Sequence, residues 1–198
     1  PDKMGELAFE NRSRPMLKLK MTGDGLDLER VENIHKNAPN TKLVVDANEG
    51  WTIDQYIDYA SRFKELGVMM IEQPLPAGSD LQLASIPHPI PVCADESCHD
   101  TSTLPELSGK YDMINIKLDK TGGLTEALKL KRLALEQGFQ IMVGCMIGTS
   151  LAMAPGLVVG QGASVVDLDG PLLLKDDREN GLEFKGSTIN VPSELLWG

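Results

Sequence analysis

Residues 43–72 read LVVDANEGWTIDQYIDYASRFKELGVMMIE. This stretch opens and closes on short apolar runs, Leu43–Asp46 and Val68–Glu72, which each end in a carboxylate. Continuous apolar runs of this length are typical of parallel strands that are buried on both faces. Between them, Thr52–Leu66 carries apolar residues at helical spacing, begins with a capping-box pair and is followed by a glycine stop. The stretch therefore predicts a strand–helix–strand unit with an acidic residue at the carboxyl end of each strand.

The same unit recurs along the chain. Charged residues close five successive apolar runs at intervals of 22 to 26 residues, which is the length that a strand, a helix and two loops require. We predict seven strands: Met16–Lys20, Leu43–Asp46, Val68–Glu72, Val92–Asp95, Met113–Lys117, Gln140–Gly144 and Val165–Asp169. The other predicted helices are Asp2–Arg12, Leu26–Asn37, Leu124–Gln137 and Ser150–Val159, with short ones at Ser79–Ser85 and Thr101–Leu107.

Alternating strands and helices predict an α/β fold with a parallel sheet. Open sheets and closed barrels both fit that alternation, but only a closed barrel brings five successive strand ends to one mouth. We therefore predict a TIM-type βα barrel. Since seven strands are found instead of eight, we expect the barrel to be incomplete in this chain, with its first strand before Pro1. Residues 1–171 should form the partial barrel catalytic domain, and residues 172–198 a C-terminal tail with a strand and turn over Leu182–Pro192.

Composition narrows the classes of function. The net charge is −10 and the isoelectric point is about 4.8, which disfavours nucleic acid and anionic membranes as partners. No apolar run approaches the roughly 18 residues of a membrane-spanning helix. The three cysteines are an odd number and provide no disulfide framework, so reduced thiols and a cytoplasmic location are expected.

Three carboxylates share the same place at the ends of neighbouring predicted strands: Asp46, Glu72 and Asp95. Carboxylate oxygens without a softer ligand suit a hard divalent cation, with Mg²⁺ the first choice and Mn²⁺ an alternative. Any one of these residues alone is more simply read as a salt-bridge carboxylate. Their common register is what favours a metal site.

Two lysines close predicted strands on either side of these acids, Lys20 and Lys117. A lysine can act as a base only if its pKa falls toward neutrality. A nearby metal ion would lower it, as would Lys18, which lies two residues from Lys20 on the same face of the strand. The alternative is that Lys18 and Lys20 are solvated edge lysines, which suits an interior strand poorly.

A further acidic pair, Asp167 and Asp169, ends the last predicted strand. Two carboxylates two residues apart on a strand face the same way and repel each other. A cationic ligand group such as a substrate ammonium would relieve that repulsion. The alternative is an acidic turn before Gly170.

Together these motifs resemble the enolase superfamily, in its muconate-lactonising subgroup, and within it the dipeptide epimerases of the L-Ala-D/L-Glu type. The resemblance covers about Met16–Pro171. The matching stretches are Leu17–Lys20, Val45–Asn48, Ile71–Pro74, Ala94–Ser97, Asn115–Gly123 and Asp167–Gly170.

The resemblance implies a role for each residue. Asp46, Glu72 and Asp95 would hold Mg²⁺, with Asn48 supporting them from a second layer. Lys20 and Lys117 would face opposite sides of the substrate α-carbon and exchange its proton through an enediolate, with Lys18 tuning Lys20. Asp167 and Asp169 would hold the free amino end of an L,L-dipeptide such as L-Ala-L-Glu, whose C-terminal residue is inverted.

The resemblance also implies an N-terminal α+β capping domain, which this chain lacks and on which its tail would pack. A missing N-terminal segment of the same protein is therefore an expected partner, and a homo-oligomer is compatible with the resemblance. Related chemistries share the lysines and the metal: N-acylamino acid racemisation, o-succinylbenzoate synthesis and muconate cycloisomerisation. The acidic pair favours a substrate with a free ammonium. An alternative of another class is an inactive barrel fragment that serves as a binding or folding unit.

Overall fold

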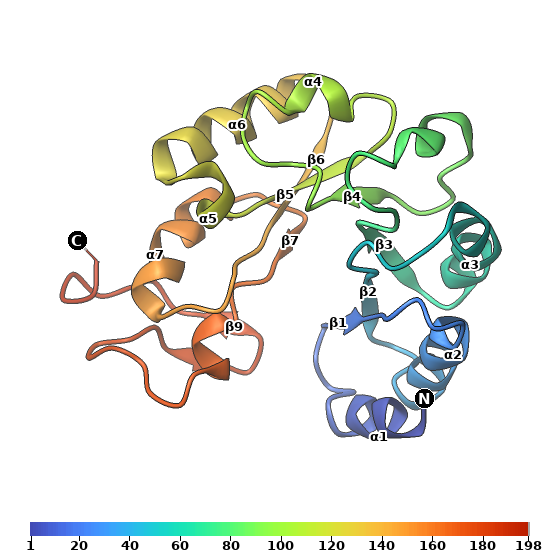
Figure 1. Cartoon of the computed structure of the whole chain (residues 1–198). Coiled ribbons are helices and arrows are strands. Elements are labelled where there is room, and N and C mark those ends of the chain that lie inside the picture. Colours follow the sequence, from blue (N-terminus) through green and yellow to red (C-terminus); the bar gives the residue numbers. More distant parts are fainter. Residues whose placement is uncertain (198) are drawn as a thin grey trace. The chain divides into compact units, whose positions relative to one another are not determined.

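The computed structural model describes residues 1–197 (Figure 1). The chain divides into two compact units. The first comprises Pro1–Ser97 with Gly109–Tyr111, and the second comprises Cys98–Ser108 with the chain from Asp112 onward. None of the helices in the described part is long and apolar enough to cross a membrane.

The first unit is built on four parallel strands that follow one another in chain order. They are β1 (Met16–Lys20), β2 (Lys42–Asp46), β3 (Val68–Glu72) and β4 (Val92–Ala94). Its helices are α1 (Asp2–Glu10), α2 (Asp27–Asn37), α3 (Ile53–Glu65) and the 3₁₀ turn η1 (Leu81–Ser85). Helices α1 and α2 lie side by side (Figure 1). Chain-order parallel pairing is what successive right-handed β–α–β crossovers produce.

The second unit repeats this arrangement with three parallel strands, β5 (Met113–Ile116), β6 (Gln140–Val143) and β7 (Val165–Val166). Its helices are α4 (Leu104–Leu107), α5 (Leu118–Thr121), α6 (Leu124–Glu136), α7 (Ser150–Val159) and the 3₁₀ turn η2 (Gly170–Leu173). The tail forms a short antiparallel hairpin of β8 (Phe184–Lys185) and β9 (Thr188–Ile189). The predicted strand and turn in Leu182–Pro192 are thereby confirmed.

Helix α3 shows how local sequence specifies an element. The Thr52 side chain accepts from the Gln55 main-chain N–H while the Gln55 side chain bonds the Thr52 N–H, so the predicted capping box is formed. Tyr56, Ala60 and Phe63 are buried, as the apolar stripe predicted. Ile57, which the same stripe included, is 51% exposed. The buried face is therefore narrower than the spacing of apolar residues suggested.

Four predicted strands are shorter in the structure, at their carboxyl ends. Strand β4 stops at Ala94 because the Asp95 N–H donates to the Gln73 side chain at 2.9 Å instead of to a strand carbonyl. Strand β7 stops at Val166, since the Asp167 N–H makes a last bond to Val143, where β6 ends. The 3₁₀ turn η2 then follows. The remaining two, β5 and β6, each end one residue before the predicted boundary.

Candidate metal and proton-transfer site

Three carboxylates gather where the strands of the first unit end. Asp46 and Glu72 are the last residues of β2 and β3 and pair with each other in the strand register. Asp95 follows β4 directly, two residues beyond Cys93, which is the register partner of Glu72. Asp46 and Glu72 have no exposed surface and Asp95 has 2%. Because parallel strands end at the same edge, residues far apart in the sequence form one acidic cluster.

Two lysines of β1 reach the same cluster. The Lys18 ammonium lies 3.2 Å from Asp46 Oδ2 and 2.9 Å from Glu72 Oε2, so it bridges the two carboxylates. The Lys20 ammonium lies 2.5 Å from Asp46 Oδ2. Lys20 is register partner to Asp46, and Lys18 lies two residues earlier on the same strand face. Both lysines pair with buried acids, but the Lys20 side chain is 61% exposed and that of Lys18 is 20% exposed. Strand β1 stands at the end of the strand order of the described sheet, so the alternative of a solvated edge lysine stays open for Lys20.

The pKa of Glu72 reflects its burial and the carboxylates beside it. Burial above all, together with the charges of Asp46 and Asp95, raises the pKa of Glu72 to about 7, while Lys18 opposes the shift. Carboxylates that share a site in this way favour a cation between them. The cluster therefore carries more buried negative charge than the bridging lysine neutralises.

The backbone at this edge is strained. Non-glycine residues with positive φ angles include Asn48 at 45°, Glu49 at 63° and Gln73 at 36°. Gln73 directly follows β3, and Asn48 and Glu49 lie two and three residues after the end of β2. The Asn48 N–H donates to Asp46 Oδ1 at 3.0 Å, so its main chain supports that carboxylate. Strained conformations of this kind cost roughly 1–3 kcal/mol each and cluster at functional sites.

The acidic cluster offers the donor atoms that a divalent cation prefers. Across residues 1–197, no three His, Cys, Asp or Glu side chains stand in a ready-made metal-holding arrangement. In donor chemistry the cluster does fit, because Asp46, Glu72 and Asp95 supply oxygen ligands only, which Mg²⁺ prefers. All three are almost wholly buried. The Lys18 ammonium pairs with both Asp46 and Glu72, and the Lys20 ammonium pairs with Asp46.

A fourth carboxylate belongs to this edge, and the sequence argument had overlooked it. Burial raises the pKa of Glu96, and the neighbouring charges of Asp95, Asp46 and Glu49 raise it further. The signal was present in the sequence as the adjacent acids Asp95 and Glu96, but only the fold brings Asp46 and Glu49 close. The site is therefore more acidic than three ligands would make it.

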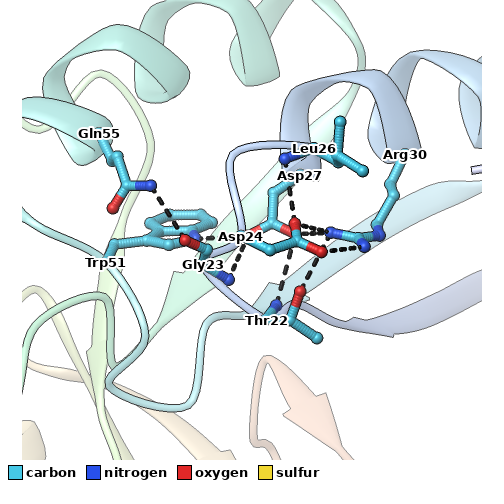
Figure 2. Close-up of polar contacts among 8 residues, drawn as sticks. All are labelled: Thr22, Gly23, Asp24, Leu26, Asp27, Arg30, Trp51 and Gln55. Atoms are coloured by element: carbon cyan, nitrogen blue, oxygen red, sulfur yellow. Dashed lines mark hydrogen bonds and ion pairs between the residues drawn. The ribbon is translucent and has the colours of Figure 1, made fainter.

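The loop that follows Lys20 is fixed by a buried carboxylate, as Figure 2 shows. Asp27, which has no exposed surface, accepts hydrogen bonds from the Gly23 N–H at 2.9 Å, from Trp51 Nε1 at 2.8 Å and from Arg30 Nη1 at 2.6 Å. Arg30 also holds Asp24, at 2.5 and 2.6 Å. Trp51 belongs to the loop after β2. One carboxylate therefore fastens the loops that follow Lys20 and Asp46 to each other.

Three predicted site residues lie in the second unit. Lys117 follows β5, is buried with 9% exposure and precedes helix α5. Asp167 follows β7 and is half-buried, and Asp169 is exposed at the start of η2. The premise that this acidic pair lies on a strand is wrong, because β7 ends before both residues. Their partnership with the acidic cluster stays a prediction.

Comparison with known proteins places the chain in a family. The family model described as Enolase C-terminal domain-like matches residues 3–195. The chain belongs to this family. An L-Ala-D/L-Glu epimerase from Escherichia coli K12 is 46% identical over 193 residues, covering 96% of this chain and 60% of that protein. An N-acetyl-D-glutamate racemase from Pseudoalteromonas is 44% identical over the whole chain and 62% of its own length.

Solved structures of enolase-family members have the same fold. A member from Agrobacterium tumefaciens with homology to dipeptide epimerases, bound to sodium and L-Ala-L-Glu, is 50% identical with a TM-score of 0.97 over 100% of this chain and 60% of that one. A dipeptide epimerase from Methylococcus capsulatus, complexed with Mg and L-Arg-D-Lys, is 28% identical with a TM-score of 0.89 over 96% and 58%. The chain thus spans about 60% of the length of these relatives. The predicted α/β fold, a TIM-type barrel present in part, is confirmed.

The loop after β1 and the loop after β2 approach each other closely at Gly23 and Gly50, so a larger residue at Gly23 should destabilise the fold. Gly23 has a φ of +70°, and a Cβ there would lie 2.0 Å from the Gly50 carbonyl oxygen. Gly25 has a φ of +85° with open space around it, so it is a matched control. Gly25→Ala should cost about 1 kcal/mol through backbone strain alone, whereas Gly23→Ala should cost about 3 kcal/mol or more. Urea unfolding measures both, and equal losses would contradict the close approach.

The raised pKa of Glu72 predicts how stability depends on pH. In protein freed of cations with a chelator, folded Glu72 keeps its proton between the ordinary pKa of 4.5 and about 7, whereas the unfolded chain loses it. The free energy of unfolding contributed by this group should therefore fall as pH rises through that window and level off above it. Glu72→Gln should lack this decline, while Glu136→Gln, at an exposed position on α6, should retain it. Identical pH profiles of unfolding for wild type and Glu72→Gln would exclude the shift.

Proposed function

We propose that the protein to which this chain belongs is an Mg²⁺-dependent dipeptide epimerase. It would invert the α-carbon of the C-terminal residue of an L,L-dipeptide such as L-Ala-L-Glu. The observation that carries the proposal is the buried cluster of Asp46, Glu72 and Asp95 with two ammonium groups of β1 directed into it. The dipeptides bound to relatives in the same family support it.

The chemical difficulty is the weak acidity of the α-proton beside a carboxylate. Asp46, Glu72 and Asp95 would hold Mg²⁺, which supplies positive charge against the substrate carboxylate when bound. Lys20, as the neutral amine, would take the α-proton from one face, and the electron pair of the broken C–H bond would pass into the carboxylate as an enediolate. Lys117, as the ammonium, would return a proton to the opposite face. One proton is removed and one is delivered, so the configuration inverts without net change in composition.

Asp167 and Asp169 would select the substrate. An ammonium at the amino end of a dipeptide is the group that two neighbouring carboxylates attract most strongly, whereas an acylated amine carries no charge for them. Burial of β2 and β3 and the hydrogen bonds of Asp27 to the loop after Lys20 would keep the reacting groups in a defined geometry. The proposed specificity thus depends on the second unit and the proposed proton transfer on both.

Similarity to one relative supports a second candidate function, the racemisation of N-acylated glutamate. The N-acetyl-D-glutamate racemase is 44% identical over the whole chain, and racemisation of N-acylated glutamate needs the same metal and the same two bases. The two substrates differ in the presence of a free ammonium. The acidic pair is therefore the feature that separates the two proposals.

Removal of either lysine provides the test of the two-base mechanism. In the full-length protein with Mg²⁺, Lys20→Ala and Lys117→Ala should each slow epimerisation of L-Ala-L-Glu by about 10²- to 10⁴-fold, the contribution of a general acid or base. Deuterium wash-in from D₂O, followed by NMR at the α-carbon, should persist for only one epimer in each variant. Lys36→Ala, an exposed lysine of α2, is the control. Wash-in at the wild-type rate from both epimers in Lys20→Ala would refute the mechanism.

Substrate competition distinguishes the two functions. The full-length protein should show a higher kcat/KM for L-Ala-L-Glu than for N-acetyl-L-glutamate by about 10²-fold, the scale expected when a site's charged groups lose their partner. Asp167→Asn with Asp169→Asn should reduce kcat/KM for the dipeptide and leave that for the acylated substrate nearly constant. A wild-type preference for N-acetyl-L-glutamate would instead assign the racemase activity.

A further inference from the structure

Gln73 occupies an unusual place beside the acidic cluster. It follows Glu72 directly, has no exposed surface and adopts a φ of +36°. This backbone conformation is unfavourable for a residue with a side chain, so the surrounding contacts must hold it. Its main chain still continues the sheet, because the Gln73 N–H donates to the Cys93 carbonyl at 2.9 Å. The strain therefore directs the side chain without breaking the sheet.

The side-chain oxygen of Gln73 holds the main chain at Asp95. It accepts from the Asp95 N–H at 2.9 Å and from the Ser97 N–H at 3.1 Å. Strand β4 ends at Ala94, so the Gln73 side-chain oxygen accepts these main-chain hydrogen bonds just beyond the point where strand pairing stops. A single buried residue thus joins the backbone that carries Glu72 to the backbone that carries Asp95.

The side-chain nitrogen fixes which way the amide points. It donates to the Leu75 carbonyl at 2.8 Å and lies 2.9 Å from the Tyr111 hydroxyl and 3.0 Å from the Ser97 hydroxyl. With acceptors around the nitrogen and two N–H donors at the oxygen, the reversed amide would place like groups together. The amide therefore has one orientation, in which the Gln73 side-chain oxygen faces the main-chain N–H of Asp95.

A buried carboxylate anchors this arrangement. Asp80, 1% exposed, accepts from the Tyr111 hydroxyl at 2.6 Å and the Ser97 hydroxyl at 2.7 Å, and pairs with Lys110 at 2.6 Å. Burial alone would raise the pKa of Asp80, but the hydrogen bonds from Lys110, Tyr111 and Ser97 lower it below its ordinary value. Asp80 therefore remains charged and keeps both hydroxyls oriented around the Gln73 amide.

We propose that Gln73 is a positioning residue for the metal site, which sets the position of the Asp95 carboxylate relative to Glu72 through the Asp95 main chain. The inference rests on the proposed function, since it concerns the same cation. A residue that merely stabilised the fold would affect unfolding alone. A positioning residue must also affect how tightly the cation binds, because the main chain that carries Asp95 depends on its amide.

Mn²⁺ binding to the full-length protein, measured by electron paramagnetic resonance, is the test. Gln73→Met keeps the size of the side chain and removes the acceptor and the donors. Its dissociation constant for Mn²⁺ should rise by about 10- to 100-fold, the usual effect of losing a group that orients a metal ligand. Asp177→Ala is the control. Asp177 accepts from the Ser150 N–H at 2.9 Å and the Arg178 N–H at 2.8 Å in the second unit, so its loss should lower the free energy of unfolding and leave Mn²⁺ affinity at the wild-type value.

Tyr111→Phe serves as the milder second variant if Gln73→Met does not fold. It removes one of the acceptors that orient the amide, so Mn²⁺ affinity should fall in the same direction by a smaller factor. Wild-type affinity in the folded Gln73→Met protein, or in Tyr111→Phe if Gln73→Met does not fold, would overturn the positioning role. A wild-type protein that binds no Mn²⁺ would instead refute the metal site on which the proposed function depends.

Discussion

Burial of like charges at the ends of parallel strands is the constraint on which this structure depends. Asp46 and Glu72 are wholly enclosed and adjacent in the strand register. A carboxylate in such a place is costly unless a positive charge or hydrogen bonds compensate it. Lys18 does so by bridging the two acids, and Lys20 adds a second contact to Asp46. Burial still raises the pKa of Glu72 above its ordinary value, although Lys18 opposes the shift.

Two separate hydrogen-bond clusters hold the loops that surround these acids. Asp27 fastens the loop after β1 to Trp51 in the loop after β2. Gln73 fastens the end of β3 to the residues that follow β4. In both cases a buried polar side chain satisfies main-chain N–H groups at the point where regular strand pairing stops. Chemistry at the ends of strands requires loops of this kind, because the functional groups lie where the sheet no longer orders the backbone.

The match to the enolase C-terminal domain-like family covers residues of both units. The first unit holds the acidic cluster and the β1 lysines. The second holds Lys117, Asp167 and Asp169, which carry the return of the proton and the choice of substrate in the proposed function. A relative bound to L-Ala-L-Glu is 50% identical to the chain, and a relative named N-acetyl-D-glutamate racemase is 44% identical. Identity alone therefore does not separate the two functions, and in the proposed function the charge of a free amino group would separate them.

Short-range patterns determined much of this protein from sequence alone. Apolar runs located all seven strands of the two parallel sets, and Thr52 with Gln55 located the start of α3, because hydrophobic periodicity and capping depend on neighbours a few residues away. Only the tertiary structure decided that Lys18 bridges Asp46 and Glu72, that Glu96 joins the acids, and that Gln73 holds Asp95. These choices depend on partners 22 or more residues apart in the sequence. The strand register and the burial of these side chains select such partners, and neither can be read from a pattern of neighbouring residues.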